Sequence, residues 1–267
     1  MINLLLHRIQ PLMLTLFLVP LPSFAFTPIS DNTAPAQDKS RSQLVSIMSN
    51  NKKVQDLIQF EVVDQNSLKI IDGANPYIGF HISETNKKVN KGVRSEISID
   101  YPFGPGDIIR YEWRFMMPQD FKSDAPKNRW WTLAQWHDQP DLNKNETWQD
   151  LPSRSPPVAI YYGALHGNDF MSVAYLNFKP TEQELIPITK GQWMKVKVEI
   201  KWSRNQNGYA KVFVNEQAQP VFSKNGPNMH NDYQHYFKLG MYRDPGIKTD
   251  NTLYVDDVNV IEMPANP

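Results

Sequence analysis

The sequence predicts an all-β protein built as a sandwich of two antiparallel sheets, and three observations support this prediction. Short segments rich in β-branched and aromatic residues recur along most of the chain, and Gly, Pro, Asn or Asp bound most of them. From Met194 to Ile200 apolar and charged side chains alternate strictly, which gives a strand one dry and one wet face. A helix-compatible pattern is confined to residues 41–50, where we expect one short helix.

About a dozen segments have the composition and length of strands. They are residues 57–63, 67–71, 77–82, 93–99, 108–117, 130–137, 158–162, 171–178, 193–202, 209–214, 236–242 and 253–261. So many short strands with almost no helix predict a jelly roll of the lectin type, the concanavalin A-like sandwich. Two long polar loops, 118–129 and 138–157, are expected to line a functional face.

The N-terminus predicts a secretory signal peptide over residues 1–25. Arg8 supplies a positive charge, a leucine-rich run follows from 12 to 21, and Ser23-Phe24-Ala25 is a small-x-small cleavage pattern. The apolar run is too short to span a bilayer. We therefore expect a protein secreted into the medium or the periplasm. Residues 26–50 are expected to form a linker with the short helix, and 51–267 the jelly-roll domain.

Composition excludes several kinds of site and partner. The chain has no cysteine, so it forms no disulfide and no thiolate site. Its 28 basic residues balance 28 acidic ones, which argues for neither nucleic acid nor a membrane as partner. No histidine spacing suggests zinc. We expect a monomer with no required cofactor; Asp256 with Asp257, or the acids of 138–150, are where a structural Ca²⁺ would bind.

Three predicted strands, 93–99, 131–137 and 236–242, alternate apolar with polar residues. Each strand should turn its apolar set toward the core and its polar set to the opposite face. One concave sheet face could then carry Arg94, Glu96, Gln135, His137, Tyr236, Lys238 and Tyr242.

These side chains fit the cleavage of a uronate-containing glycan by β-elimination. That reaction needs a base for the C5 proton, a group that stabilises charge on the neighbouring carboxylate, and an acid for the departing glycosidic oxygen. Gln135 and Arg94 suit the second task, where one donor is typically worth about 10²–10³ in rate. His137 or Tyr242 suits the base and Tyr242 the acid. A tyrosine base, with an ordinary pKa of about 10, would need cationic neighbours such as Arg94 or Lys238.

Three short segments resemble the signature motifs of the jelly-roll alginate lyases, which are Arg-x-Glu-Leu, Gln-x-His and Tyr-Phe-Lys-x-Gly-x-Tyr. The segments are Arg94-Ser95-Glu96-Ile97, Gln135-Trp136-His137 and Tyr236-Phe237-Lys238-Leu239-Gly240-Met241-Tyr242. The stretch from about 57 to 263 looks most like the related heparin lyase I and glucuronan lyase group.

The resemblance implies a role for each residue that matches a motif. Gln135 and Arg94 would bind and neutralise the uronate carboxylate. His137 and Tyr242 would be the base and acid pair, and Lys238 would contact substrate. Tyr236, Glu96 and Trp136 complete the predicted substrate-binding set, with Glu96 orienting its neighbours. Calcium occurs in some members of the resembled group, so the binding of a structural Ca²⁺ stays an open alternative.

Departures from the alginate lyase motifs shift the expected polymer. Trp136 stands where those enzymes usually have Ile or Val, and Ser98 where they often have a second Arg. Arg243-Asp244 follows Tyr242 in place of their x-Gln. These differences favour a glucuronan-like or heparin-like substrate over alginate.

Two other functions stay open at this point. A non-catalytic, lectin-like carbohydrate-binding protein could use the same sandwich, because function depends on the site and not on the fold. A retaining glycoside hydrolase on this fold carries three acids at alternate positions of one strand, with the catalytic carboxyl groups about 5–5.5 Å apart. Ser98 interrupts that pattern between Glu96 and Asp100, which disfavours hydrolysis.

Overall fold

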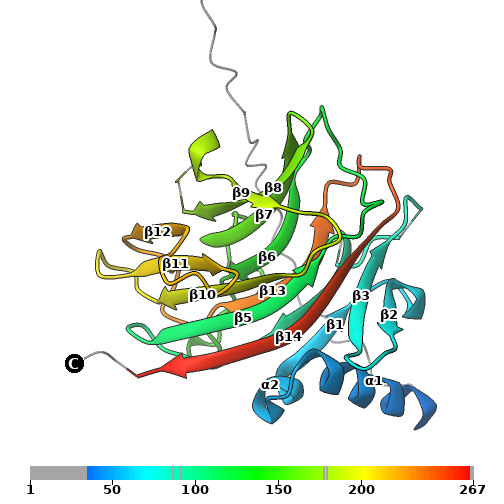
Figure 1. The fold of residues 1–267 in the computed structure, drawn as a ribbon. Helices are drawn as coiled ribbons and strands as arrows, with labels where there is room; N and C mark the ends of the chain where they lie inside the picture. Colours follow the sequence, from blue (N-terminus) through cyan, green and yellow to red (C-terminus); the bar gives the residue numbers. More distant parts are fainter. Residues whose placement is uncertain (1–34, 86, 91, 177, 179, 265–267) are drawn as a thin grey trace, which may run out of the picture.

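The computed structural model describes residues 35–264 apart from 86, 91, 177 and 179. Two seven-stranded sheets stack face to face, in the orders β1-β4-β13-β6-β7-β8-β9 (sheet A) and β12-β11-β10-β5-β14-β3-β2 (sheet B) (Figure 1). The predicted all-β sandwich is therefore confirmed. The strands are β1 Ile58–Glu61, β2 Leu68–Ile71, β3 Tyr77–Ile82, β4 Val93–Ile99, β5 Ile108–Met116, β6 Trp131–His137, β7 Val158–Leu165, β8 Asn168–Tyr175, β9 Ile186–Ile188, β10 Met194–Lys201, β11 Tyr209–Val214, β12 Phe222–Asn225, β13 Tyr236–Arg243 and β14 Asn251–Met263.

The predicted strands agree with these bounds to within a few residues, and two strands were not predicted. β9 and β12 are three and four residues long. Each forms one edge of its sheet, where a strand pairs on one side only. Segments so short, one of them containing Pro187, show no alternation that could identify them from sequence.

Two helices, α1 Pro35–Met48 and α2 Lys52–Leu57, precede the first strand. α1 begins earlier than the predicted 41–50, with proline at its first position, where the missing N–H costs nothing. Val45 and Met48 are buried in the core, and α1 lies beside β3 and β14 (Figure 1). The expected linker is therefore helical from 35 to 48, and this helix packs on the sandwich.

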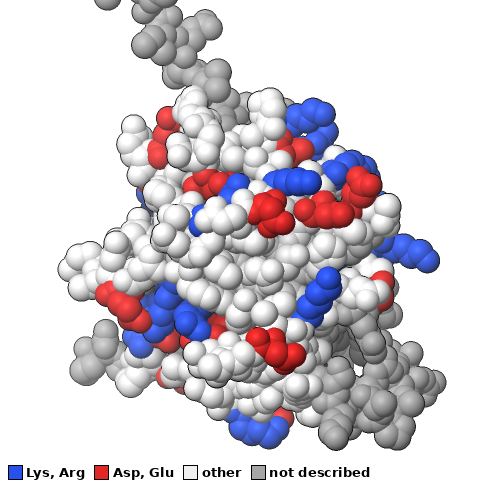
Figure 2. All heavy atoms as spheres, turned by 45° about the vertical axis from the view of Figure 1, so that its right-hand side comes forward, with Lys and Arg blue, Asp and Glu red and all other residues white. Residues whose placement is uncertain are grey.

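The predicted signal peptide 1–25, and residues 26–34 of the linker, lie outside the described residues. Within the described part of the chain, no helix is long and apolar enough to cross a membrane. Basic and acidic side chains are interspersed on the face of the molecule shown in Figure 2, in line with the balanced charge of the sequence.

Aromatic side chains from both sheets fill the centre of the core. Trp136 of β6 stacks on Phe237 of β13 with ring centroids 5.0 Å apart, and Tyr111 of β5 meets both rings edge-on or tilted at 5.2 and 5.1 Å. Such arrangements add to the gain from burial alone. The contacts fix the inner face of β6 and β13, and so decide which residues point the other way.

A bulge in β13 sets the register of its outer face. Relative to β6, the register of β13 shifts between Leu239 and Tyr242. Gly240 in this stretch has a φ of 141°, and a Cβ there would lie 2.5 Å from the carbonyl oxygen of Ser95 on β4. Only glycine fits that conformation and that approach. The glycine of the Tyr-Phe-Lys-x-Gly-x-Tyr motif thus has a backbone role.

Candidate active site

The three strands that carry the predicted polar residues lie side by side in sheet A, with β13 between β4 and β6. Their register pairs the predicted residues across the strands. Tyr242 lies opposite Arg94, Lys238 opposite Gln135, and Tyr236 opposite His137, while Glu96 faces Gly240. The structure therefore places seven of the eight predicted site residues on the sheet face that points away from the aromatic core.

At one end of this face, four buried side chains form an ion-pair cluster: Glu61, Arg94, Glu96 and Lys238. Arg94 Nη1 donates to Glu96 Oε1 at 2.7 Å and to Glu61 Oε2 at 3.1 Å. Lys238 Nζ lies 2.7 Å from Glu61 Oε1 and 3.6 Å from Glu96 Oε1. Two cations and two carboxylates cancel, which is how buried charges are tolerated.

Glu61 is a member of this cluster that we did not predict. It is the last residue of β1 and lies opposite Glu96 on β4. The sequence carried a partial signal, because Gln59 and Glu61 alternate with the apolar Ile58 and Phe60. What the sequence could not show is that β1 pairs with β4, which brings Glu61 to the site.

The cluster shifts the pKa values of its carboxylates in opposite directions. Burial alone would raise the pKa of Glu61, but Lys238 and Arg94 outweigh it and hold that pKa below its ordinary value. Burial dominates at Glu96 and raises its pKa. Glu61 is therefore the carboxylate that the two cations hold more firmly in its ionised form, and Glu96 is the more easily protonated of the two.

Tyr242 lies against the cluster, with its ring centroid 4.0 Å from the Arg94 guanidinium carbon. The ring rests on Gly92, where a Cβ would come within 2.4 Å of it. Burial raises the pKa of Tyr242, and Arg94 offsets this only in part. Tyr242 therefore keeps its proton at neutral pH. A tyrosine base would need cationic neighbours that lower its pKa, and Arg94 does not bring the pKa of Tyr242 below its ordinary value, so an acid role fits better.

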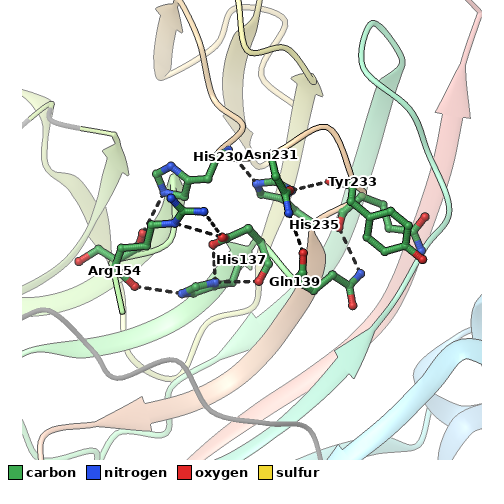
Figure 3. Close-up of polar contacts among 10 residues, drawn as sticks. His137, Gln139, Arg154, His230, Asn231, Tyr233 and His235 are labelled. Carbon is green, nitrogen blue, oxygen red and sulfur yellow. Dashed lines mark hydrogen bonds and ion pairs between the residues drawn. The ribbon is translucent and has the colours of Figure 1, made fainter. Parts of the chain in front are cut away.

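At the other end, His137, Asp138 and Arg154 form what we call the histidine network (Figure 3). His137 Nδ1 hydrogen bonds to the backbone carbonyl of Asp138 at 3.0 Å and lies 2.8 Å from the carboxylate oxygen Oδ1. His137 Nε2 lies 3.1 Å from the backbone carbonyl of Arg154. Arg154 belongs to the 138–157 loop, so this predicted functional loop does contact the site.

Asp138 is almost completely buried, and the Arg154 guanidinium and the His137 ring lie against its carboxylate. Its Oδ2 accepts from Arg154 Nε at 3.0 Å and also from Nη2. Burial alone would raise the pKa of Asp138, but His137 and Arg154 hold it well below its ordinary value. Asp138 was not predicted as a site residue, because strand alternation ends at His137 and gives no direction for the next side chain.

A loop beside the histidine network is fastened by uncharged hydrogen bonds. His235 is fully buried; its Nδ1 bonds to the Tyr233 carbonyl at 3.0 Å and its Nε2 accepts from the His230 N–H at 3.3 Å (Figure 3). Burial lowers the pKa of His235 to about 3. Asn231 Nδ2 donates to the Gln139 carbonyl at 2.7 Å. These contacts hold neutral side chains and have a structural role.

Gln135 lies between the two ends, opposite Lys238 and two positions before His137. On its other side it faces the small Ala159 of β7. Its side chain is buried, yet the amide makes no hydrogen bond to any residue that the structure describes. A buried amide without a protein partner is available to a ligand.

Aromatic rings border both ends of the face. Tyr236 stacks on His137 with parallel rings and centroids 5.8 Å apart, and Trp148 of the 138–157 loop meets Tyr236 at 6.2 Å. Trp130 meets the Tyr242 ring edge-on at 4.8 Å. Both tryptophans are half-buried, so each has ring surface that a sugar could contact.

His137 and Tyr242, the predicted base and acid, are not neighbours across the strands. His137 lies opposite Tyr236, six positions from Tyr242 along β13. Six residues of extended strand span about 20 Å between Cα positions, and the base and acid of one elimination act on adjacent carbons, so both side chains must extend toward each other. A sugar between them would have to lie over Lys238 and Gln135. The tyrosine in contact with His137 is Tyr236.

One predicted substrate contact is wrong. Trp136 has no exposed surface and lies between the sheets, stacked on Phe237. Strand alternation turns Trp136 away from the face that holds Gln135 and His137. The Trp136 ring fills the core beneath the site.

Of the acidic positions considered for calcium, Asp256 and Asp257 are engaged with a cation, and so are Asp138 and Asp141 of the segment 138–150. Arg114 forms ion pairs with both Asp256 and Asp257. In residues 35–264, leaving out the four that are not described, no three His, Cys, Asp or Glu side chains are grouped so that they could hold a metal ion.

Solved structures show what this fold is similar to. Similar chains include an endo-β-1,4-glucuronan lyase from the fungus Trichoderma reesei (14% identity, TM-score 0.51, 79% of this chain and 88% of that chain). Others are the alginate lyase Aly36B (14%, 0.53, 78% and 88%) and the catalytic domain of a glycoside hydrolase family 131 protein from Coprinopsis cinerea (12%, 0.51, 78% and 84%). At such identities the likeness shows the fold alone, and two kinds of enzyme share it.

The family comparison separates those two kinds. None of the curated proteins compared with the chain matches it. Residues 34–259, which include α1 and all the strands that carry the site, match the family described as polysaccharide lyase. The chain therefore belongs to the polysaccharide lyase family, and it is a polysaccharide lyase.

Proposed function

We propose that this chain is a secreted lyase that cleaves a uronate-containing acidic polysaccharide by β-elimination. Glucuronan-like or heparin-like polymers are the leading substrates, with alginate behind them. The observation that carries the proposal is the buried amide of Gln135, which hydrogen bonds to no residue that the structure describes and lies beside His137 on a face bordered by Tyr236 and Tyr242. A neutral donor at that position suits a uronate carboxylate on which charge develops.

These side chains can supply every proton transfer that the elimination needs. His137 takes the C5 proton, and the electron pair of that bond forms the C4–C5 double bond. The C4–oxygen bond breaks, and the departing glycosidic oxygen takes a proton from Tyr242, which burial keeps protonated. The enzyme is restored when the proton on His137 returns to Tyr242 through solvent. Gln135 donates to the carboxylate while charge resides there.

Arg94 has a different role in this proposal from the one the motif implies. Its Nη1 is already bound to Glu61 and Glu96, so it is not a free cation for the substrate carboxylate. Lys238 is likewise bound to Glu61. Because the strand-borne cations are neutralised, we place glucuronan-like polymers ahead of densely sulfated heparin among the two leading substrates.

The test is an assay of the purified protein on glucuronan, alginate, heparin and chemically desulfated heparin. We expect ultraviolet absorbance from the unsaturated uronate end to grow as polymer is cut, with faster cleavage of desulfated than of sulfated heparin. New reducing ends without that absorbance would mean hydrolysis. Binding without products would support the lectin alternative, and equal or faster cleavage of sulfated heparin would contradict the charge argument.

The proposed reaction uses side chains of the chain alone, and we propose that it needs no cofactor. Treatment with a chelator should leave the initial rate unchanged. A loss of rate that added Ca²⁺ restores would instead reveal a calcium ion that supports the site or the fold.

Secretion rests on the N-terminal sequence. We expect the exported protein to begin after Ala25. Mass spectrometry of the protein recovered from the periplasm or medium of a producing cell measures this directly, and an uncleaved N-terminus in the cytoplasm would contradict it.

A further inference from the structure

We propose that Asp138 is a positioning residue for the elimination, acting as the counter-ion of the imidazolium that forms when His137 takes the substrate proton. The inference rests on His137 being the base of the proposed function. It adds a residue that belongs to none of the three motifs.

Position favours this role. Asp138 follows His137 directly at the end of β6, and its Oδ1 lies 2.8 Å from His137 Nδ1. His137 Nδ1 lies 3.0 Å from the Asp138 carbonyl and Nε2 lies 3.1 Å from the Arg154 carbonyl, and a carbonyl oxygen only accepts. Once substrate takes the place of the Arg154 carbonyl, the neutral ring donates from Nδ1 to the Asp138 carbonyl, and Nε2 is its basic nitrogen. The backbone of Asp138 thus sets the tautomer, while its carboxylate faces the charge that the ring gains.

Among the charged and titratable groups around the His137 ring, Asp138 is the one suited to act as counter-ion. Arg154 from the loop, His230 and His235 from the neighbouring loop, and Tyr236 from β13 are the other titratable or charged groups that face His137. Asp138 is the carboxylate among them. Its second oxygen is held by Arg154, so the carboxylate cannot rotate away from the ring.

The Arg154 carbonyl covers the basic nitrogen of the His137 ring before substrate binds. It lies 3.1 Å from His137 Nε2, so a carbonyl occupies the place where the C5 proton must arrive. Substrate has to displace that carbonyl, which belongs to the 138–157 loop. Asp138 stays in place during this exchange, because its contact with Nδ1 is made at the strand end.

Asp138→Asn tests the role by removing the charge while keeping the shape and the backbone carbonyl. On the polymer that is cut fastest, we expect kcat to fall about 10–100-fold with KM nearly unchanged. The acidic limb of the kcat/KM profile should move to lower pH by roughly one unit, because the imidazolium loses its carboxylate. A displaced ring alone would lower kcat without moving that limb.

Asp141→Asn is the matched control. It removes the same charge from the same loop, where Asp141 pairs with Lys144 and contacts neither His137 nor Arg154. The pH profile of this variant should coincide with that of the wild type. An equal shift in both variants would show a general effect of loop charge and would overturn the specific role of Asp138.

His137→Ala, assayed in parallel, separates this inference from the proposed function. Full activity of His137→Ala would overturn the base assignment and the inference with it. An inactive His137→Ala beside an Asp138→Asn enzyme with normal kcat and an unmoved limb would overturn the inference alone. Should Asp138→Asn fail to fold, NMR of the neutral wild-type ring decides: the proposal requires the ring proton on Nδ1, beside Asp138, and a proton on Nε2 overturns it.

Discussion

The two ends of the site face handle charge in different ways. In the ion-pair cluster, Glu61, Arg94, Glu96 and Lys238 all come from strands and bind one another. In the histidine network, a residue at a strand end is held by Arg154, a loop residue. The first set can change only if strands separate, whereas the second can exchange partners when a loop moves.

This difference suggests a division of labour. A closed set of buried ion pairs stabilises a given arrangement of strands, because losing one partner leaves a charge uncompensated. The Arg154 carbonyl lies on a loop, so it can move away from His137 Nε2 when a substrate takes its place. We therefore expect substitutions in the cluster to act mainly on stability and those in the histidine network mainly on rate.

The largest expected effect falls on catalysis and asks which tyrosine works with His137. His137→Ala and Tyr242→Phe should each lower kcat about 10²–10⁴-fold, the usual worth of a general base or acid, with the fold intact by circular dichroism. Tyr236→Phe is the matched comparison, because it removes a hydroxyl from the same strand and keeps the ring stacked on His137. We expect it to lower the rate far less.

The opposite result would move the chemistry along β13. If Tyr236→Phe abolished turnover and Tyr242→Phe did not, the acid would lie in contact with His137 and the elimination would occur at that end. Near-normal activity of His137→Ala would place the base elsewhere.

The second effect tests the stabilising role of the ion-pair cluster. Glu61→Ala leaves Arg94 and Lys238 buried with one carboxylate between them, and breaking such a set typically costs about 3–5 kcal/mol of unfolding free energy. Chemical denaturation measures it. Glu216→Ala is the control, because Glu216 pairs with Lys195 on the exposed surface and should have no measurable effect. Equal stability of both variants would contradict the contrast between buried and exposed pairs.

The fold and much of the site follow from local patterns, and the failures have specific causes. Alternation in β4, β6 and β13 predicts the outward set from Arg94 to Tyr242, because one buried face imposes a period of two. The same rule places Trp136 in the core. Trp136 was predicted as a substrate contact because it lies between Gln135 and His137 in the motif. A motif names neighbours in sequence, whereas the pleat decides which of them share a face.

Other parts of the site depend on contacts that no local pattern encodes. Glu61 joins the cluster only because β1 pairs with β4, a contact made over 35 positions of sequence between Glu61 and Glu96. Asp138 and Arg154 meet because a loop folds back over the end of β6. The pKa of Tyr242 rises because burial outweighs Arg94, a balance that requires knowing how deeply the ring lies.

A third, smaller effect is the pH dependence of the stability that Asp138 contributes at the histidine end. Asp138 has a pKa below its ordinary value of 3.8, so its ionised form stabilises the fold fully above that value. The contribution is lost as pH falls through the lower folded-state pKa. The wild type should therefore exceed Asp138→Asn in unfolding free energy at neutral pH, and this difference should shrink below about pH 4. A difference that grew toward acid would contradict the direction of the shift.

The smallest expected effect asks which end of the face holds the polymer. Trp148 lies in the loop beside Tyr236, and Trp130 lies against Tyr242; both keep exposed ring surface. Loss of one aromatic contact is worth about 0.5–1.5 kcal/mol, so Trp148→Ala should raise KM roughly 2–10-fold with kcat nearly unchanged. Steady-state kinetics on a polymer series measures this, with Trp130→Ala as the matched variant at the ion-pair end. If Trp130→Ala alone raised KM, the polymer would be held over the rigid strands, and the loop end would serve the chemistry without binding the sugar ring.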